Sequence, residues 1–223
     1  MFYGPKLELW TEISTQPGSN RFTISDRLTN HGSYEQEFQV IYHANYGPPL
    51  LEEGARFVGP VSRVYPFNEH AARDVLTFDR YAAPKLGVVE QVYTLYPLAD
   101  EQGRTTVALR NQDATRAVSM SFSVAQLPYL TLWKNTNSLE DGYVTEIEPG
   151  TGFTYNRRVE RQFGRVPKLR PGETRHFGIE VAIHEGRAEV RSVLDRISRI
   201  ERGRERVLEP APQRRVQPLD RSR

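Results

Sequence analysis

Candidate chemistry is concentrated first in residues 41–49, where an imidazole and a carboxamide precede a glycine- and proline-rich turn. On a β-strand, Ile41, His43 and Asn45 share one face because side chains alternate between the two faces. An imidazole can transfer protons near neutral pH, and a carboxamide both donates and accepts hydrogen bonds. The pair suits a hydroxyl-rich ligand, but the same spacing also fits a structural histidine that is hydrogen-bonded at the end of a strand.

A second candidate group comes from two expected strands, residues 127–135 and 143–151. Trp133 offers a broad flat surface that can stack on the apolar face of a sugar ring. In the later strand Glu146 and Glu148 share one face, and the proline after Glu148 ends the strand, so this carboxylate can project from the strand end. The alternative is that the tryptophan packs in the core and the glutamates face water.

The elements that must hold these residues are predicted from two-residue alternation of apolar side chains, which is typical of strands. The pattern is clearest in residues 7–13, 118–124 and 177–183. Less regular runs occupy residues 22–24, 38–45, 88–96, 105–109, 129–134 and 143–148. Turn signals such as Pro171-Gly172-Glu173 separate the runs. The sequence therefore predicts an all-β antiparallel sandwich.

Length and composition fit one large domain with a short helical addition. The chain has 223 residues, of which 38% are hydrophobic, enough for one sizeable core over residues 1–186. Apolar residues at helical spacing predict an amphipathic helix over residues 187–202. Residues 203–223 hold many arginines and few apolar side chains, so we expect a disordered tail there.

Composition also excludes several classes of protein. The chain has no cysteine, so disulfides, thiolate metal sites and a cysteine nucleophile are excluded. A formal net charge of +2 gives no electrostatic case for a nucleic-acid partner. No segment reads as a signal peptide or a membrane span, so we expect a cytoplasmic protein without a membrane partner.

Five ordered blocks of the sequence resemble the aldose 1-epimerase-like family known as DUF4432, in the galactose mutarotase-like superfamily. The blocks are IYH-x-N-x-G-x-PLL-x-EGA (41–55), EQVY (90–93), LP-x-LTLWKN (127–135), GYV-x-x-x-EPGT (142–151) and NR (156–157). The resemblance covers residues 1 to about 183. It implies an antiparallel β-supersandwich with a polar cleft for a sugar on the concave face of one sheet.

The resemblance also implies a reaction. In mutarotases a glutamate removes the proton of the anomeric hydroxyl and a histidine protonates the ring oxygen, so that the ring opens and recloses. Matched by motif, Glu148 is expected as the base and His43 as the acid, separated by the width of a pyranose. The expected ligand contacts are Asn45, Glu90, Trp133, Lys134 and Arg157. Neither a metal nor another cofactor is expected, and the two cations suggest a sugar with a negative group.

His31 competes with His43 for the role of acid, because LTNH at residues 28–31 resembles another mutarotase motif. We prefer His43 because it ends an apolar strand, whereas Asn30-His31-Gly32-Ser33 is typical of a loop.

The start of the chain departs from the family pattern. Relatives carry a further upstream stretch with another histidine motif, so we expect that the N-terminal part of the domain is missing here. Three functions stay open: an isomerase of sugar anomers, a carbohydrate-binding domain without turnover, and an inactive fragment of a longer epimerase-like protein. The sequence predicts neither the identity of the sugar nor the number of subunits.

Overall fold

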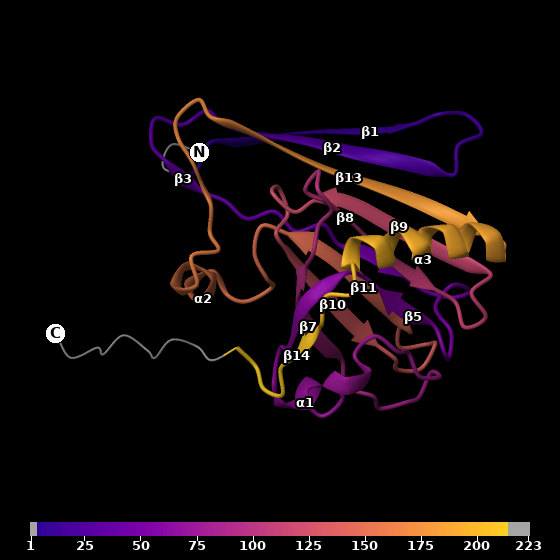
Figure 1. The fold of residues 1–223 in the computed structure, drawn as a ribbon. Coiled ribbons are helices and arrows are strands. Elements are labelled where there is room, and N and C mark those ends of the chain that lie inside the picture. Colours follow the sequence, from indigo (N-terminus) through magenta and orange to yellow (C-terminus); the bar gives the residue numbers. More distant parts are fainter. Residues whose placement is uncertain (1–3, 214–223) are drawn as a thin grey trace, which may run out of the picture.

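Two six-stranded sheets form the body of the protein in a computed structural model that describes residues 4–213 (Figure 1). The first sheet has the strand order β1–β2–β13–β9–β8–β5, and its strand pairs are antiparallel. Its strands are Leu7–Thr15 (β1), Arg21–Asn30 (β2), Thr174–Glu185 (β13), Arg116–Ser123 (β9), Arg104–Arg110 (β8) and Arg56–Val58 (β5).

The second sheet has the order β14–β6–β7–β10–β11–β4. Its strands are Val207–Leu208 (β14), Val61–Pro66 (β6), Gln91–Pro97 (β7), Tyr129–Asn135 (β10), Val144–Gly150 (β11) and Ala44–Tyr46 (β4). β14 runs parallel to β6, and the other pairs are antiparallel. A small third sheet joins Gln36–Glu37 (β3) to Lys168–Leu169 (β12).

Side-chain alternation gives the second sheet one buried apolar face and one polar face. Leu95, Leu130 and Ile147 are fully buried in the main hydrophobic core, together with side chains of the first sheet. Because successive residues point to opposite faces, their neighbours in sequence point away from this core. We call the outer surface of the second sheet the site face; its central residues are Thr94 of β7, Thr131 of β10 and Glu148 of β11.

The helices lie outside the two sheets. α3 (Arg187–Glu201) packs Val193 and Ile197 on Ala108 of β8, along the first sheet (Figure 1). The shorter α1 (Glu69–Ala72) and α2 (Arg157–Gln162) follow asparagines whose side chains accept a backbone N–H of the first turn. A 3₁₀ turn covers Val75–Thr77. Within residues 4–213, no helix combines the length and the apolar character that crossing a membrane requires.

The expected fold class is confirmed, and the helix expected near the C-terminus is observed as α3. The expectation of one helix is incomplete, because α1 and α2 are also present. These helices have four and six residues, which is too short for a helical repeat to show in a sequence.

Two strand predictions differ from the structure for local reasons. β6 was not expected, because a register shift between Val61 and Arg63 interrupts the alternation. The strand expected over residues 38–45 is wrong over most of its length, since β4 begins only at Ala44.

The expectation of a disordered tail is wrong for Val207 and Leu208, which form β14 and pair with Arg63 and Val64 of β6. Residues 214–223 of the expected tail lie outside the described residues.

Leu132→Ala tests the packing between the sheets. Leu132 is fully buried on the inner face of β10, so we expect a loss of about 2–5 kcal/mol in the free energy of unfolding, measured by urea denaturation. Leu86→Ala is the control, because Leu86 is 76% exposed, and should change stability by less than about 0.5 kcal/mol. Equal effects of the two substitutions would contradict the two-layer core.

Candidate functional site

The segment that leads into β4 is held between the two sheets, and this fixes the direction of His43. The backbone N–H of Tyr42 donates to the carbonyl of Pro149 at 3.0 Å, and the Tyr42 hydroxyl donates to the carboxylate of Asp26 on β2. Because Tyr42 turns toward the first sheet, the next side chain turns to the opposite side. His43 therefore lies on the site face, beside Glu148.

A glycine at the end of β11 allows this segment to approach so closely. A Cβ atom on Gly150 would lie 2.9 Å from Cγ1 of Ile41 and 3.0 Å from the carbonyl oxygen of Val40. Thr151 fixes the crossing, because its N–H donates to the Val40 carbonyl at 2.9 Å and its hydroxyl accepts the Val40 N–H at 3.0 Å. The Pro-Gly-Thr run after Glu148 thus positions both His43 and the carboxyl group.

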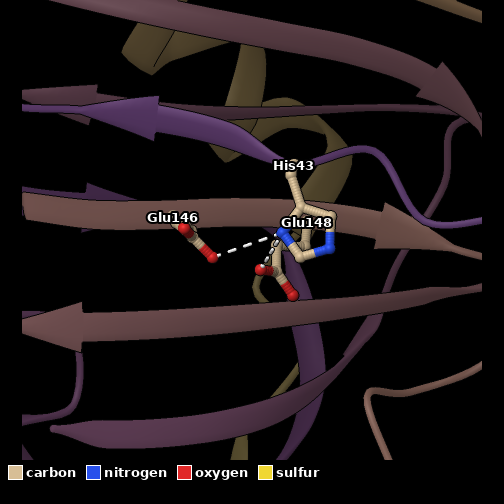
Figure 2. Close-up of side chains that lie close together, drawn as sticks. All are labelled: His43, Glu146 and Glu148. Atoms are coloured by element: carbon tan, nitrogen blue, oxygen red, sulfur yellow. Dashed lines mark hydrogen bonds and ion pairs between the residues drawn. The ribbon is translucent and has the colours of Figure 1, made fainter.

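His43 and Glu148 are in direct contact on the site face (Figure 2). His43 Nδ1 lies 2.9 Å from Glu148 Oε1 and 3.4 Å from Glu146 Oε2. The His43 side chain is 59% exposed, whereas that of Glu148 is 3% exposed. The structure therefore pairs a buried carboxyl group with an imidazole that is open to solvent.

Burial, together with the hydrogen bond and the charge of Glu146, raises the pKa of the Glu148 carboxyl group to about 9. Burial disfavours the charged form, and a neighbouring carboxylate disfavours a second negative charge. At neutral pH Glu148 accordingly keeps its proton. It can then donate a hydrogen bond, which an ionised glutamate cannot do.

Asn45, Trp133 and Glu90 lie on the same face as the pair. Asn45 and Trp133 are both directly opposite Glu146, one on β4 and the other on β10. The indole N–H of Trp133 donates to Glu90 Oε2 at 2.8 Å. Three of the five expected ligand contacts therefore lie on the site face with His43 and Glu148.

Lys134 and Arg157 are not brought to the pair. Lys134 is buried on the opposite side of β10, where its ammonium donates to the Arg80 carbonyl at 2.6 Å and lies 4.9 Å from the ring centre of Tyr81. Burial lowers the pKa of Lys134 to about 8. Arg157 begins α2, and its Nε donates to Gln39 at 2.9 Å. Lys134 therefore gives no support to the expectation of a negative group on the ligand.

The spacing expected between acid and base is wrong. No pyranose fits between a nitrogen and an oxygen that are 2.9 Å apart, so a sugar has to approach both groups from the same side. A separate cavity of about 580 Å³ is lined by residues that include Arg165, Arg175 and His176. The rival His31 lies 3.0 Å from Glu8, beside the first sheet.

Sequence reasoning did not list Glu146, Thr94 or Thr131 as site residues. Glu146 shares the alternation of Glu148 and could have been found from it. The threonines give no comparable signal, because threonine is common in strands and the pairing register is not visible in one sequence.

His43, Glu146 and Glu148 also form a group that could hold a metal ion, since one ligand atom from each lies within 4.8 Å of the others. One imidazole nitrogen and two carboxylate oxygens suit divalent cations such as zinc or manganese. Binding would require Glu148 to release its proton.

The raised pKa of Glu148 predicts a pH-dependent stability. Between the ordinary pKa of 4.5 and the folded-state value of about 9, the native state holds a proton that the unfolded state releases, so stability falls as the pH rises. The Glu148→Gln variant lacks this pH dependence. Its free energy of unfolding should therefore rise relative to that of the wild type as the pH increases from about 5 to about 9. Urea denaturation across this range measures the difference.

Glu12→Gln, at an exposed position on β1, is the control for the substitution itself and should change the free energy of unfolding by less than about 0.5 kcal/mol at each pH. A constant difference between wild type and Glu148→Gln at every pH would contradict the raised pKa.

Comparisons with known proteins add to this geometry. The family model described as "Domain of unknown function (DUF4432)" matches residues 1–183. A search of curated proteins found no match. A solved structure from Klebsiella pneumoniae, described as a "putative aldose 1-epimerase", is similar with a TM-score of 0.92 and 39% identity, over 96% of this chain and 56% of that one.

More distant solved structures agree in fold alone. A galactose mutarotase-like protein from Clostridium acetobutylicum is 17% identical with a TM-score of 0.52, over 81% of this chain and 57% of that one. A "putative aldose 1-epimerase" from Escherichia coli is 12% identical with a TM-score of 0.53, over 80% of this chain and 60% of that one. The chain thus spans less than two thirds of the length of these proteins. It belongs to the DUF4432 family and has a galactose mutarotase-like fold.

Proposed function

We propose that the protein binds an aldose on the site face and interconverts its anomers by proton transfer at the His43–Glu148 pair. The observation that carries the proposal is the 2.9 Å contact between an exposed imidazole and a buried carboxyl group that keeps its proton at neutral pH. The description of the Klebsiella pneumoniae protein, at 39% identity, supports the same class of reaction.

Ring opening needs two proton transfers at neighbouring oxygens. The O–H bond of the anomeric hydroxyl O1 and the C1–O5 bond break, while the C1=O1 double bond and an O5–H bond form. Because O1 and O5 are both bonded to C1, an acid and a base that lie side by side can serve both oxygens from one side of the sugar. Rotation about C1–C2 then presents the other face of the carbonyl for closure.

The protonation of Glu148 assigns the direction of these transfers. Protonated Glu148 donates its proton to O5, and neutral His43 accepts the proton of O1. Ring closure reverses both steps and returns each proton to the group that supplied it. The assignment is the reverse of the roles that the family resemblance implies, and it follows from the burial of the carboxyl group.

Trp133, Asn45 and Glu90 would hold the sugar over the pair. The Glu90 carboxylate fixes the indole of Trp133 through their 2.8 Å hydrogen bond, so the ring plane is oriented before a ligand arrives. Asn45 is exposed and can donate and accept hydrogen bonds with sugar hydroxyls.

Carbohydrate binding without turnover is the second candidate function. It is favoured by the presence of these three contacts on the same face, because they bind a sugar whether or not protons are transferred. Saturable sugar binding without accelerated anomer exchange would support this function over catalysis.

Removing either member of the pair should abolish most of the catalysis. We expect His43→Gln and Glu148→Gln to lower the rate of anomer exchange of D-galactose and D-glucose by about 10²-fold or more, as is typical for general acid–base groups. Exchange NMR measures this rate after subtraction of the uncatalysed reaction. His31→Gln is the matched control, since His31 also contacts a glutamate, at 3.0 Å, and should leave the rate unchanged. A wild-type rate in Glu148→Gln would remove Glu148 from the mechanism.

The pH profile distinguishes the two possible directions of transfer. If Glu148 is the acid, the rate should fall as the pH rises through its pKa of about 9, because the donor loses its proton. If Glu148 is the base, the rate should rise through the same interval. Polarimetry of freshly dissolved sugar from about pH 6 to about pH 10 gives the profile, with Glu148→Gln as the reference.

A further inference from the structure

Three neighbouring oxygen atoms on the site face are buried without a hydrogen-bond partner among the described residues: Thr94 Oγ1, Thr131 Oγ1 and Glu148 Oε2. Thr131 lies directly opposite Thr94 in the β7–β10 pair and opposite Glu148 in the β10–β11 pair. Adjacent strands are about 4.8 Å apart. The three side chains therefore form a continuous row across the sheet, which we call the polar row.

The burial of the polar row is almost complete. Thr94, Thr131 and Glu148 are 0%, 1% and 2% exposed. Buried polar atoms are nearly always hydrogen-bonded, because the bonds to water that they lose on folding are otherwise not replaced. Three exceptions side by side, on the face that carries His43, indicate a hydrogen-bonding partner that comes from outside the chain.

The segment after β11 explains why the polar row is covered. Phe153 packs on Tyr96 and Tyr129, with ring centres 5.4 and 4.9 Å away. Tyr96 is two residues after Thr94 on β7, and Tyr129 is two residues before Thr131 on β10. Phe153 therefore lies along one side of the polar row.

Tyr155, two residues after Phe153, lies along the opposite side of the polar row. Tyr155 stacks on Phe67 with ring centres 4.3 Å apart, and the backbone N–H of Phe67 donates to Val92. Val92 is two residues from Thr94, on the side away from Tyr96. Residues 153–155 thus cover the polar row, so a ligand can reach it only if this segment moves.

The chemistry of the row fits uncharged hydroxyl groups. A hydroxyl both donates and accepts, so successive hydroxyls of a sugar ring can pair with the two threonines and with the carboxyl group of Glu148. The neighbouring side chains Glu146 and Glu90 are acidic, and Lys134 points to the other side of the sheet. Arg165 stacks on Tyr129 and Phe153 beside the row, and Arg63 lies over Tyr65 on β6, but these guanidinium groups are already paired with Glu160 and Glu209. An anionic group would therefore meet the charge of Glu146 next to cations that already have carboxylate partners.

We infer that Thr94, Thr131 and Glu148 bind successive hydroxyl groups of an uncharged sugar. The inference rests on the proposed function and adds to it a set of ligand-binding residues and a class of substrate.

Thr94→Val and Thr131→Val test the inference, because valine keeps the shape of threonine and removes the hydroxyl. Each variant should bind D-galactose and D-glucose about 5- to 100-fold more weakly in an NMR titration of the full chain. Thermal unfolding should occur at the same or a higher temperature, since the lost hydroxyl has no partner in the free protein. The wild type should bind D-galacturonate at least about tenfold more weakly than D-galactose.

Thr105→Val is the matched control. Thr105 Oγ1 is also buried without a partner, but it lies on β8 of the first sheet. This variant should bind both uncharged sugars like the wild type.

The outcomes separate the inference from the proposed function. If the wild type exchanges anomers and both valine variants at the row bind sugar normally, the row is structural and the inference fails while the function stands. Equal binding of D-galacturonate and D-galactose would overturn the substrate class. If the wild type neither binds nor exchanges uncharged sugars, the inference and the proposed function both fail.

Discussion

The burial of one carboxyl group beside another is the constraint on which the candidate site depends. Ionising Glu148, whose side chain is 3% exposed, would place a second negative charge next to Glu146, so the neutral form is favoured. Among residues 4–213, Glu148 Oε2 has no hydrogen-bond partner, and the His43 ring that contacts Oε1 is open to solvent. A single local environment therefore controls the protonation and the unmet hydrogen-bonding capacity of the site, and it sets the direction of the proton transfer that we propose.

Strand pairing supplies the rest of the geometry. Apolar residues on the inner face of β7, β10 and β11 pack against the first sheet, and the alternate residues are then forced onto the site face. The antiparallel register sets Trp133 opposite Glu146 and Thr131 opposite Glu148. The ligand-facing residues are therefore positioned by the stability of the core, because a slip of one residue would turn every one of them inward.

Alternation alone predicted much of the sandwich and the shared face of Glu146 and Glu148. It could not predict the contact between residues 43 and 148, which are far apart in sequence and meet only through strand pairing; the family resemblance suggested that pair. Lys134 shows the opposite case. Its adjacency to Trp133 already indicated opposite faces of β10, but the motif match placed both at the ligand. β6 was not predicted, because a register shift between Val61 and Arg63 interrupts the alternation of its side chains.

The hydrogen bond from Tyr42 to Asp26 links the residue before His43 to a strand of the other sheet. Asp26 is itself buried and also accepts the hydroxyl of Thr11 on β1 at 2.5 Å. The orientation of the imidazole is consequently coupled to the N-terminal hairpin, although no residue of that hairpin lies on the site face. The first two strands thus help to hold an imidazole in the opposite layer, and loss of the Asp26 carboxylate would release the hydroxyl of Tyr42 beside His43.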